Sequence, residues 1–520
     1  MALVAEENGE RSQPARAAWQ LAAMLLGPVL FVVALWGIPA QADLSLAGRR
    51  VLAVAVLMAW WWITEAIPVP ATALLPLVLL PLLKVQPMRE VASCYADSTI
   101  FLFMGGFFLA VSMERWGLHR RLALHVIRLL GSNPRTLVLG FMAATAALSM
   151  WISNTATTLM MYPLALALLA HLDQASSAVG EQSSARLKTA LMLGVAYGAS
   201  IGGIGTLIGT PPNVIFAAQL ARLFPDAPPF GFLDWMKVGL PFVLLFLPLS
   251  WLILTRLTFP LAKESVAQGR QLVREELARL GRPSRGEWLV GVVFLLTALA
   301  WVSRADVDLG SKRILGWATL LGVGTVVDDA TIAMAAAVLL FVLPVNLGQR
   351  VFVLDWQTAR GIPWGVLILF GGGIALAGAF ESSGLAAWVG GRLSLLRPLP
   401  PLVFVVMVCL TTTFLTEVTS NTAVASIFTP VLAATGVAVG IHPLLLMIPG
   451  AISASCAFML PVATPPNAIV FASGQVSIPQ MARAGVLLNF LGVILVTLVV
   501  FLVAVPAFGI KMGTLPAWAH

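Results

Sequence analysis

The sequence predicts an all-α polytopic membrane protein made of two related halves. Of its 520 residues, 59% are hydrophobic and 10% are charged, whereas charged residues make up about a quarter of an ordinary soluble domain. Long apolar stretches recur, for example from Leu240 to Leu254 and from Val486 to Val505, and a bilayer crossing takes roughly 20 residues. A polar tetrapeptide, Ser-Asn-Thr-Ala, interrupts this apolar sequence twice, at 153–156 and at 420–423.

The chain opens with residues 1–46, which we expect to form a cytoplasmic N-terminus and a first transmembrane helix. The apolar run from Ala18 to Ile38 is too long for the core of a signal peptide. Ala40-Gln41-Ala42 resembles a cleavage site, but the run before it is predicted to be retained as a span.

The rest of the chain contains two segments that align with each other. Phe103–Leu118 matches Phe370–Leu385 at an offset of 267 residues, and the two Ser-Asn-Thr copies share that offset. Each copy is followed by a second motif, Gly209-Thr210-Pro211-Pro212-Asn213 or Ala463-Thr464-Pro465-Pro466-Asn467, at an offset of 254. We assign the 13-residue difference to a polar loop, His171–Lys188, that only the first half contains. Self-similarity of this kind indicates an internal duplication.

Each half is predicted to contain five crossings and one re-entrant hairpin, which with the leading span gives about eleven transmembrane helices. The first repeat covers 47–260, with a hairpin at 135–172 and a broken helix at 207–213. The second covers 287–508, with a hairpin at 400–439 and a broken helix at 461–467. Residues 261–286 connect the repeats, and 509–520 form an extracytoplasmic tail. Because five is odd, the second half enters from the opposite face, so the repeats have inverted topology, as in secondary transporters.

Basic residues predict the orientation of the chain. They gather between Arg115 and Arg135 and again between Arg256 and Arg285, and the positive-inside rule places such loops in the cytoplasm. The N-terminus is then cytoplasmic, in the plasma membrane or the inner membrane of a Gram-negative cell. These loops account for the formal charge of +8 without a nucleic-acid partner.

Two basic segments are predicted to be helices outside the hydrocarbon region. Arg115–Leu130 alternates basic and apolar residues at helical spacing, which favours a helix along the inner membrane interface over one that binds a soluble partner. Gln268–Arg282 has a weaker form of this pattern and is interpreted as a cytosolic connecting helix.

The paired motifs predict breaks in membrane helices. Proline has no backbone N–H and disfavours helix in the residue before it, so Pro211-Pro212 and Pro465-Pro466 should unwind their helices. Freed carbonyls, with Ser, Thr and Asn oxygens, suit a cation such as sodium, and exposed helix N-termini favour an anion. Two facing Asn-Thr pairs could hold the two carboxylates of one small molecule. Neither hairpin interior contains Lys or Arg, so a bound dianion would need co-bound cations.

Other polar residues are weaker candidates for chemistry. Glu417 lies beside the second Ser-Asn-Thr, where the first half has Met150, and either a proton or cation role or a structural hydrogen bond fits it. Asp328 and Asp329 precede an apolar run and are interpreted as helix caps. The five histidines and three cysteines lack metal-ligand or disulfide spacing. Hydrolase, P-loop and HExxH motifs are absent from the sequence, so we predict neither a catalytic site nor direct ATP coupling.

The duplicated Ser-Asn-Thr and Thr-Pro-Pro-Asn motifs resemble those of the divalent anion/sodium symporter (DASS) family, and the likeness covers nearly the whole chain after the first span. The resemblance implies a homodimer within the lipid membrane, in which a transport domain moves like an elevator against a scaffold. By motif, it implies a first sodium site made of Ser149, Ser153, Asn154 and the Gly209 backbone, and a second made of Thr416, Thr419, Asn421 and Ala463. The residues that it implies for the substrate are Asn154, Thr155, Thr210, Pro211, Asn421, Thr422, Thr464 and Pro465. No cofactor is implied besides sodium as the coupling ion.

The leading hypothesis is therefore sodium-coupled uptake of C4-dicarboxylates such as succinate, malate or fumarate. Within the same family, a dicarboxylate exchanger without sodium coupling, a citrate carrier and a sulfate carrier are open alternatives. Outside it, the alternatives are a channel and a membrane enzyme that acts on a lipid-soluble substrate. An enzyme would need a nucleophile or a metal site that the sequence does not offer.

Overall fold

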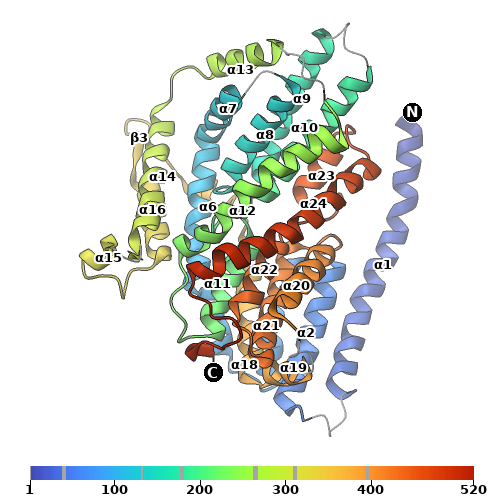
Figure 1. Ribbon diagram of the computed structural model, residues 1–520, viewed down its shortest axis with the longest axis vertical. Coiled ribbons are helices and arrows are strands. Elements are labelled where there is room, and N and C mark those ends of the chain that lie inside the picture. The colour runs from blue at the N-terminus through green and yellow to red at the C-terminus, as the bar shows by residue number, and fades with distance from the viewer. Residues whose placement is uncertain are drawn as a thin grey trace.

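A computed structural model gives the fold of the chain, and it describes residues 2–37, 43–130, 133–175, 181–261, 267–308, 313–393 and 399–519. These residues are almost entirely helical (Figure 1). The strands among them form two short antiparallel pairs, Val307–Asp308 (β1) with Arg313–Ile314 (β2) and Pro344–Asn346 (β3) with Val351–Phe352 (β4). The predicted all-α class is confirmed.

Eight helical segments among the described residues are long and apolar enough to cross a membrane. They are Trp19–Trp36, Leu46–Thr64, Met88–Trp116, Phe232–Thr258, Arg285–Arg304, Trp364–Ser382, Asn421–Val439 and Ile478–Ala507. Shorter apolar helices occur among the described residues as well, and they include Asn154–Ala170 and Pro401–Thr416 of the two predicted hairpins. The chain is thus a multi-pass membrane protein, while the count of eleven crossings stays a prediction.

The described residues of the first half form helices without strands. They are α1 (Ala2–Trp36), α2 (Leu46–Thr64), α3 (Val69–Thr72), α4 (Leu75–Leu82), α5 (Met88–Ser93), η1 (Cys94–Ala96), α6 (Ser98–Trp116), α7 (Leu118–Leu130), α8 (Pro134–Ser149), α9 (Asn154–Ala175), α10 (Glu181–Gly203), α11 (Pro211–Leu223), α12 (Phe232–Leu252) and the π-helical turn η2 (Ile253–Thr258).

The second half follows a connecting helix, and it contains the four strands between α14 and α17. Its helices are α13 (Ala267–Leu280), α14 (Arg285–Arg304), α15 (Trp317–Leu320), α16 (Asp329–Val342), α17 (Trp356–Ala359), α18 (Trp364–Ser382), α19 (Leu385–Leu393), α20 (Pro401–Thr416), α21 (Asn421–Val439), α22 (Leu444–Ser453), α23 (Pro465–Phe471), α24 (Ile478–Val499), η4 (Val500–Ala504), α25 (Val505–Ala507) and η5 (Ala517–Ala519).

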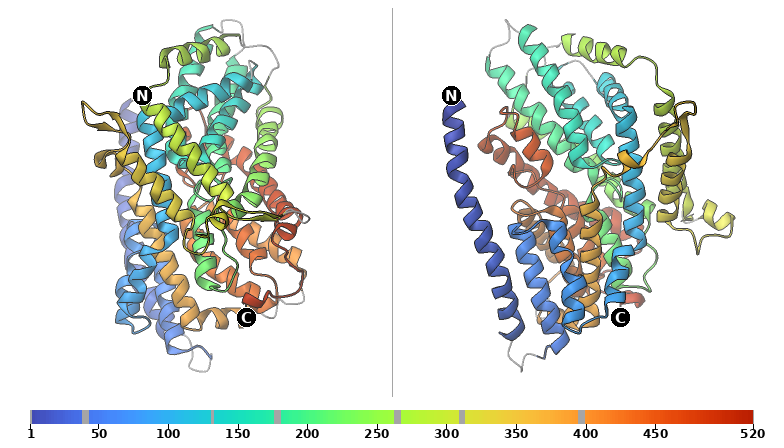
Figure 2. Two further views of the ribbon diagram at one scale, coloured as in Figure 1. Left: turned by 90° about the vertical axis from the view of Figure 1, so that its left-hand side faces the viewer. Right: turned by 180° about the vertical axis from the view of Figure 1, so that it is seen from behind.

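The first helix lies along one side of the molecule, away from the main body (Figures 1 and 2). It packs on α2, where the indole of Trp60 donates to the carbonyl of Ala23 at 2.8 Å. Because most of its described side chains are exposed, this helix offers its outer face to lipid. The cleavage-like Ala40-Gln41-Ala42 lies outside the described residues.

Two helix pairs correspond to the predicted hairpins. The arms α8 and α9 meet at a turn over 150–153, and α20 and α21 meet at a turn over 417–420, so each turn falls at a Ser-Asn-Thr copy. The first arm begins with a capping box in which Asn133 accepts from Thr136 N at 2.9 Å. The two pairs lie at opposite ends of the molecule (Figure 1). Whether each pair re-enters from one membrane face stays a prediction.

Paired glycines let helices approach closely at matching positions of the two halves. A Cβ at Gly105 of α6 would lie 2.6 Å from the Ala333 backbone of α16. At its counterpart Gly372 of α18, a Cβ would collide with the Ala73 carbonyl. Both helices then end at a left-handed glycine, Gly117 with φ 73° and Gly384 with φ 75°, a conformation that glycine adopts without steric cost.

The prediction of a polar loop at His171–Lys188 is wrong. Helix α9 continues to Ala175 and α10 begins at Glu181, so most of the extra residues of the first half lengthen two helices. Ala, Arg, Leu and Lys in this stretch are strong helix formers, which outweighs the polar composition.

The two basic helices outside the core contact each other. Helix α7 buries Ala123, Leu124 and Ile127 on one face. Its arginines pair with acids of the connecting region, Arg120 with Glu276 of α13 at 2.7 Å and Arg121 with Glu287 of α14 at 2.8 Å. The connecting helix predicted at Gln268–Arg282 is α13, and it lies over α7 at one end of the molecule (Figure 1).

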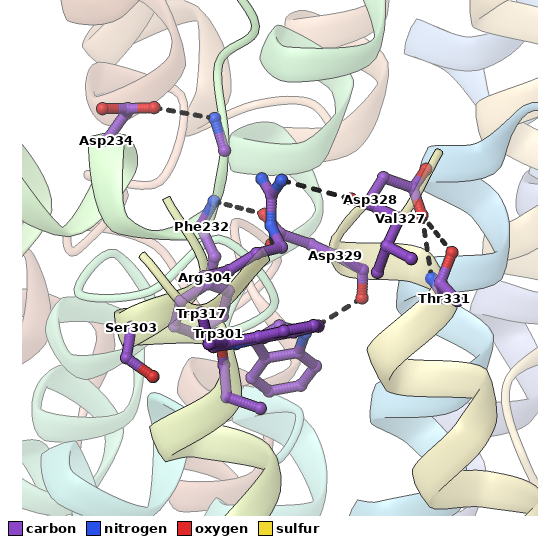
Figure 3. Close-up of polar contacts among 12 residues, drawn as sticks. Phe232, Asp234, Trp301, Ser303, Arg304, Trp317, Val327, Asp328, Asp329 and Thr331 are labelled. Carbon is purple, nitrogen blue, oxygen red and sulfur yellow. Dashed lines mark hydrogen bonds and ion pairs between the residues drawn. The ribbon is translucent and has the colours of Figure 1, made fainter. Parts of the chain in front are cut away.

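The pair Asp328 and Asp329 has two different roles (Figure 3). Asp328 is the N-cap of α16 and accepts from Thr331 N at 2.8 Å, so its predicted role is confirmed. The cap assignment is wrong for Asp329, whose buried carboxylate binds Arg304 Nε at 2.6 Å and accepts from Phe232 N at 2.7 Å. A buried carboxylate needs such partners to offset its desolvation, and here they join α14, α16 and the start of α12.

Aromatic rings extend this junction toward the first hairpin turn. Trp301 donates to the carbonyl of Asp329 at 2.9 Å and stacks on Phe232, with ring centroids 4.7 Å apart. Trp151, in the turn between α8 and α9, stacks on Phe232 at 5.9 Å and meets Phe294 edge-on at 4.9 Å. The turn is therefore packed against α12 and α14 by large apolar surfaces.

The contact between α8 and α10 can be tested at Gly202, where a Cβ would collide with the Ala146 backbone. We expect Gly202→Ala to destabilise the protein by about 1–3 kcal/mol, because the helices must move apart. Thermal unfolding in detergent measures the effect. Gly291→Ala on α14 is the matched control, since its Cβ meets only Leu118 Cδ2 at 3.6 Å. Equal unfolding temperatures for the two variants would contradict the close packing.

Candidate functional site

The two Ser-Asn-Thr turns line one cavity of about 910 Å³. The broken helices contribute its other polar wall through Thr210, Pro211, Thr464 and Pro465. Residues separated by 267 positions thus line the same cavity. All eight residues predicted for the substrate line this cavity, namely Asn154, Thr155, Thr210, Pro211, Asn421, Thr422, Thr464 and Pro465.

The residues predicted for sodium divide into two layers. Six of the eight line the cavity itself, namely Ser153, Asn154, Gly209, Thr419, Asn421 and Ala463. The remaining two, Ser149 and Thr416, are buried behind it at the ends of α8 and α20. Each donates its hydroxyl to the asparagine five residues on: Ser149 Oγ to Asn154 Oδ1 at 2.6 Å, and Thr416 Oγ1 to Asn421 Oδ1 at 2.7 Å. The two halves therefore orient their asparagines in the same way.

In the first half, oxygen atoms gather where α10 stops. A Cβ at Gly203 would collide with Asn154 Oδ1 and lie 3.1 Å from the Gly209 carbonyl oxygen. The Cα of Gly203 thus lies next to both Asn154 Oδ1 and the Gly209 carbonyl oxygen, and only glycine at this position leaves room for these two atoms. With the Ser149 hydroxyl bound to Asn154, three predicted ligands of one cation site lie close together.

The unwound segment between α10 and α11 depends on Asn213. Its buried side-chain nitrogen donates to the carbonyls of Gly203 at 3.1 Å and Thr206 at 2.7 Å. In the second half Asn467 occupies the same place and donates to the carbonyls of Ala457 at 3.3 Å and Leu460 at 3.0 Å. The asparagine of each Thr-Pro-Pro-Asn motif thus replaces hydrogen bonds that the broken helix has lost.

The second half has a hydroxyl available for a cation. Thr419 is buried and lines the cavity, yet its Oγ1 has no hydrogen-bond partner among the described residues. Thr416 Oγ1 also contacts the Ala454 carbonyl at 2.9 Å. Neutral hydroxyl, amide and carbonyl oxygens of this kind are the ligands that unwound transporter helices offer to sodium.

The cavity also receives helix N-termini. Helices α9, α11 and α21, of 22, 13 and 19 residues, begin at its wall. The first amides of α9 and α21 have no partner within the helix, whereas α11 begins with Pro211 and Pro212, which have no N–H. The dipoles of all three helices place partial positive charge at the wall. An anion is therefore favoured in the cavity without any lysine or arginine in its lining.

Part of the wall was not predicted from the sequence. Thr64 and Glu65 at the end of α2, Phe103 and Phe107 of α6, and Pro363 before α18 complete the cavity. Glu65 is the one charged side chain among the lining residues, and it holds φ at 48°. An acidic residue that ends an apolar span just before Pro68 was the available signal, but no sequence pattern connects it with the distant Ser-Asn-Thr copies.

Comparison with known proteins identifies the family of this chain. The model of the sodium:sulfate symporter transmembrane region matches residues 19–508. The chain belongs to this family. Membership confirms the resemblance predicted from the duplicated motifs and places the chain among transporters rather than enzymes.

Full-length relatives are closely similar. A protein of Staphylococcus saprophyticus named sodium-dependent dicarboxylate transporter SdcS is 44% identical over 496 residues, which cover 95% of this chain and 93% of the relative. The SdcS protein of Staphylococcus aureus strain MSSA476 is 44% identical over 498 residues, with the same coverage. The crystal structure of the YdaH transporter of Alcanivorax borkumensis covers 88% of this chain and 98% of its own, with a TM-score of 0.56 and 15% identity. That structure shares the fold.

The two Thr-Pro-Pro-Asn asparagines provide a direct test of the broken helices. We expect Asn213→Ala and Asn467→Ala each to cost about 1–3 kcal/mol of stability, because buried carbonyls lose their donors. Thermal unfolding measures this, and Asn346→Ala in the exposed β3 region is the control. Variants as stable as this control would show that the asparagine amides do not hold the breaks.

Proposed function

We propose that this protein is a secondary active transporter that carries C4-dicarboxylates, such as succinate, malate or fumarate, into the cell together with sodium. The observation that supports this best is the single cavity in which two Asn-Thr pairs face each other without a cationic side chain. The relatives named as sodium-dependent dicarboxylate transporters agree with it.

The cavity suits a small dianion. Asn154 with Thr155 can bind one carboxylate, and Asn421 with Thr422 the other, while Thr210, Pro211, Thr464 and Pro465 shape the pocket between them. Since Oδ1 of each asparagine accepts from Ser149 or Thr416, its amide nitrogen is left to donate to the anion.

Sodium offsets the charge of the substrate in this proposal. The first ion would be held by Ser149, Ser153, Asn154 and the Gly209 carbonyl, and the second by Thr416, Thr419, Asn421 and the Ala463 carbonyl. Each asparagine then belongs to both a cation site and the anion site. Binding of sodium fixes the orientation of the amide that the dicarboxylate needs, which provides a physical basis for coupling.

The proposed transport cycle follows from the duplicated architecture. We infer two inverted repeats with re-entrant hairpins at α8–α9 and α20–α21, and a mobile domain that contains these hairpins and the broken helices. The mobile domain would move like an elevator against the remaining helices in a homodimer. The N-terminus would be cytoplasmic in the plasma membrane, because the basic helices α7 and α13 lie at one end of the molecule.

Sodium coupling is tested by uptake of labelled succinate into proteoliposomes. We expect an inward sodium gradient to raise the initial rate at least about tenfold over an equal potassium gradient, since each dianion needs compensating cations. Uptake that is the same in both gradients would contradict symport. Counterflow from preloaded vesicles then measures exchange, and competition by citrate and sulfate ranks those anions against succinate.

The substrate assignment is tested at the two hairpin turns. We expect Asn154→Ala and Asn421→Ala each to reduce succinate uptake by about 100-fold or more, because a buried carboxylate contact worth about 3 kcal/mol is lost together with a cation ligand. Uptake in proteoliposomes with equal amounts of inserted protein gives the comparison, with Asn346→Ala as control. Normal uptake by both variants would refute the site.

A further inference from the structure

The two hairpin turns differ at one position. Where the first half has Met150, the second has Glu417, between the end of α20 and the Ser-Asn-Thr copy. Glu417 is 3% exposed and does not line the cavity. Because a buried carboxylate in a membrane protein is costly, this asymmetry calls for a physical role.

The Glu417 carboxylate binds the unwound segment of the second half. Its Oε1 accepts from Phe458 N at 2.7 Å, Met459 N at 2.9 Å and Asn489 Nδ2 at 2.7 Å. Its Oε2 accepts from Met459 N at 3.0 Å and Leu460 N at 3.1 Å. All of these partners are donors, which matches an ionised carboxylate, since a carboxylic acid would need an acceptor for its proton.

This carboxylate accepts from an amide whose counterpart in the first half donates to a backbone carbonyl. In the first half, Ile204 N and Gly205 N donate to carbonyls of the preceding turn at 3.2 and 2.9 Å, and α10 runs to Gly203. At the offset of 254 residues, Phe458 corresponds to Ile204, but its amide donates to Glu417 instead. Helix α22 ends at Ser453, four residues before the position that matches Gly203, and the amides of Ser455 and Cys456 still donate to carbonyls of the preceding turn. Glu417 is the acceptor for the three amides beyond them, Phe458 to Leu460.

The charge of Glu417 is not balanced by a cationic side chain. The ion pairs found among the described residues do not include it. Its neighbour Thr416 contacts both Asn421 and the carbonyl of Ala454. Thr419, two residues after Glu417, has a hydroxyl without a hydrogen-bond partner among the described residues. A cation in the second site, whose predicted ligands Thr416 and Thr419 lie on either side of Glu417 in the sequence, would supply a compensating positive charge.

We propose that Glu417 is a positioning residue of the second sodium site. It holds the unwound segment from Phe458 to Leu460, which leads to the Ala463 carbonyl, and it adds a full negative charge behind neutral ligands. The first site has Met150 at this place and only neutral ligands. The second site therefore binds sodium more tightly than the first. This inference rests on the proposed sodium-coupled transport.

Charge and geometry are separated by two substitutions. In Glu417→Gln the charge is lost while an amide of the same length remains, and we expect the sodium concentration for half-maximal succinate uptake to rise about tenfold or more, equivalent to about 1.4 kcal/mol. Glu417→Asp keeps the charge and should stay within about threefold of the unaltered protein. Maximal uptake at saturating sodium should fall less than about threefold in both. Glu381→Gln, outside the cavity, is the matched control.

A second readout uses purified protein with sodium chloride alone. Sodium should raise the unfolding temperature of the control more than that of Glu417→Gln at the same concentration, because binding to the folded state stabilises it. If Glu417→Gln does not insert, Asn489→Leu replaces it; this variant keeps the charge but removes one donor, and half-saturation should rise about two- to threefold.

Unaltered sodium dependence in Glu417→Gln, or in Asn489→Leu where that variant is used, would overturn the proposal, even if the unfolding temperature fell. Loss of sodium dependence in Glu417→Asp as complete as in Glu417→Gln would overturn the role of the charge. These failures leave sodium-driven uptake by the unaltered protein intact. Failure of the proposed function, in contrast, removes the sodium response of the unaltered protein itself.

Discussion

The structure depends on one constraint: every backbone N–H and C=O in an apolar interior needs a hydrogen-bond partner. The broken helices α10–α11 and α22–α23 lack the regular hydrogen bonds of a continuous helix where they are interrupted. Asn213 and Asn467 supply donors to the freed carbonyls, and Glu417 supplies an acceptor to freed amides in the second half. Once these groups are satisfied, the remaining oxygens and helix N-termini are free to face the cavity.

Close helix packing keeps this polar centre in place. Gly202 on α10 sits against the α8 backbone, and Gly203 leaves space for the Asn154 side chain. The turn of the first hairpin is fixed from outside by Trp151, which stacks on Phe232. Phe232 is in turn bound to the Arg304–Asp329 pair through its backbone amide. A movement of α12 relative to α14 and α16 would have to break this junction, so it connects the site with the helices at the periphery.

The same geometry explains how neutral residues can select charged ligands. A lysine or arginine in the cavity would hold a dianion without sodium, and coupling would be lost. Amides, hydroxyls and helix N-termini bind an anion more weakly, so the ions provide the remaining positive charge. Glu65 at the wall and Glu417 behind it both carry the sign that favours cations.

The sequence alone determined the fold class, the duplication and the motif residues that line the cavity. The motifs around Asn154 and Asn421 were found because a polar run in apolar sequence is energetically costly. The Ser-Asn-Thr copies also share their offset with a second pair of aligned segments, which indicates a duplication rather than a chance match. Local sequence patterns gave wrong predictions at positions where the structure depends on contacts between distant parts of the chain. The loop predicted at His171–Lys188 is largely helix, and Asp329, interpreted as a cap, is an ion-pair partner of Arg304. Only the tertiary structure assigned Glu65 to the cavity and Glu417 to the amides of Phe458–Leu460. The physical reason is that the role of a buried carboxylate depends on hydrogen-bond donors that are distant in the sequence, whereas a repeated motif can be recognised from the sequence itself.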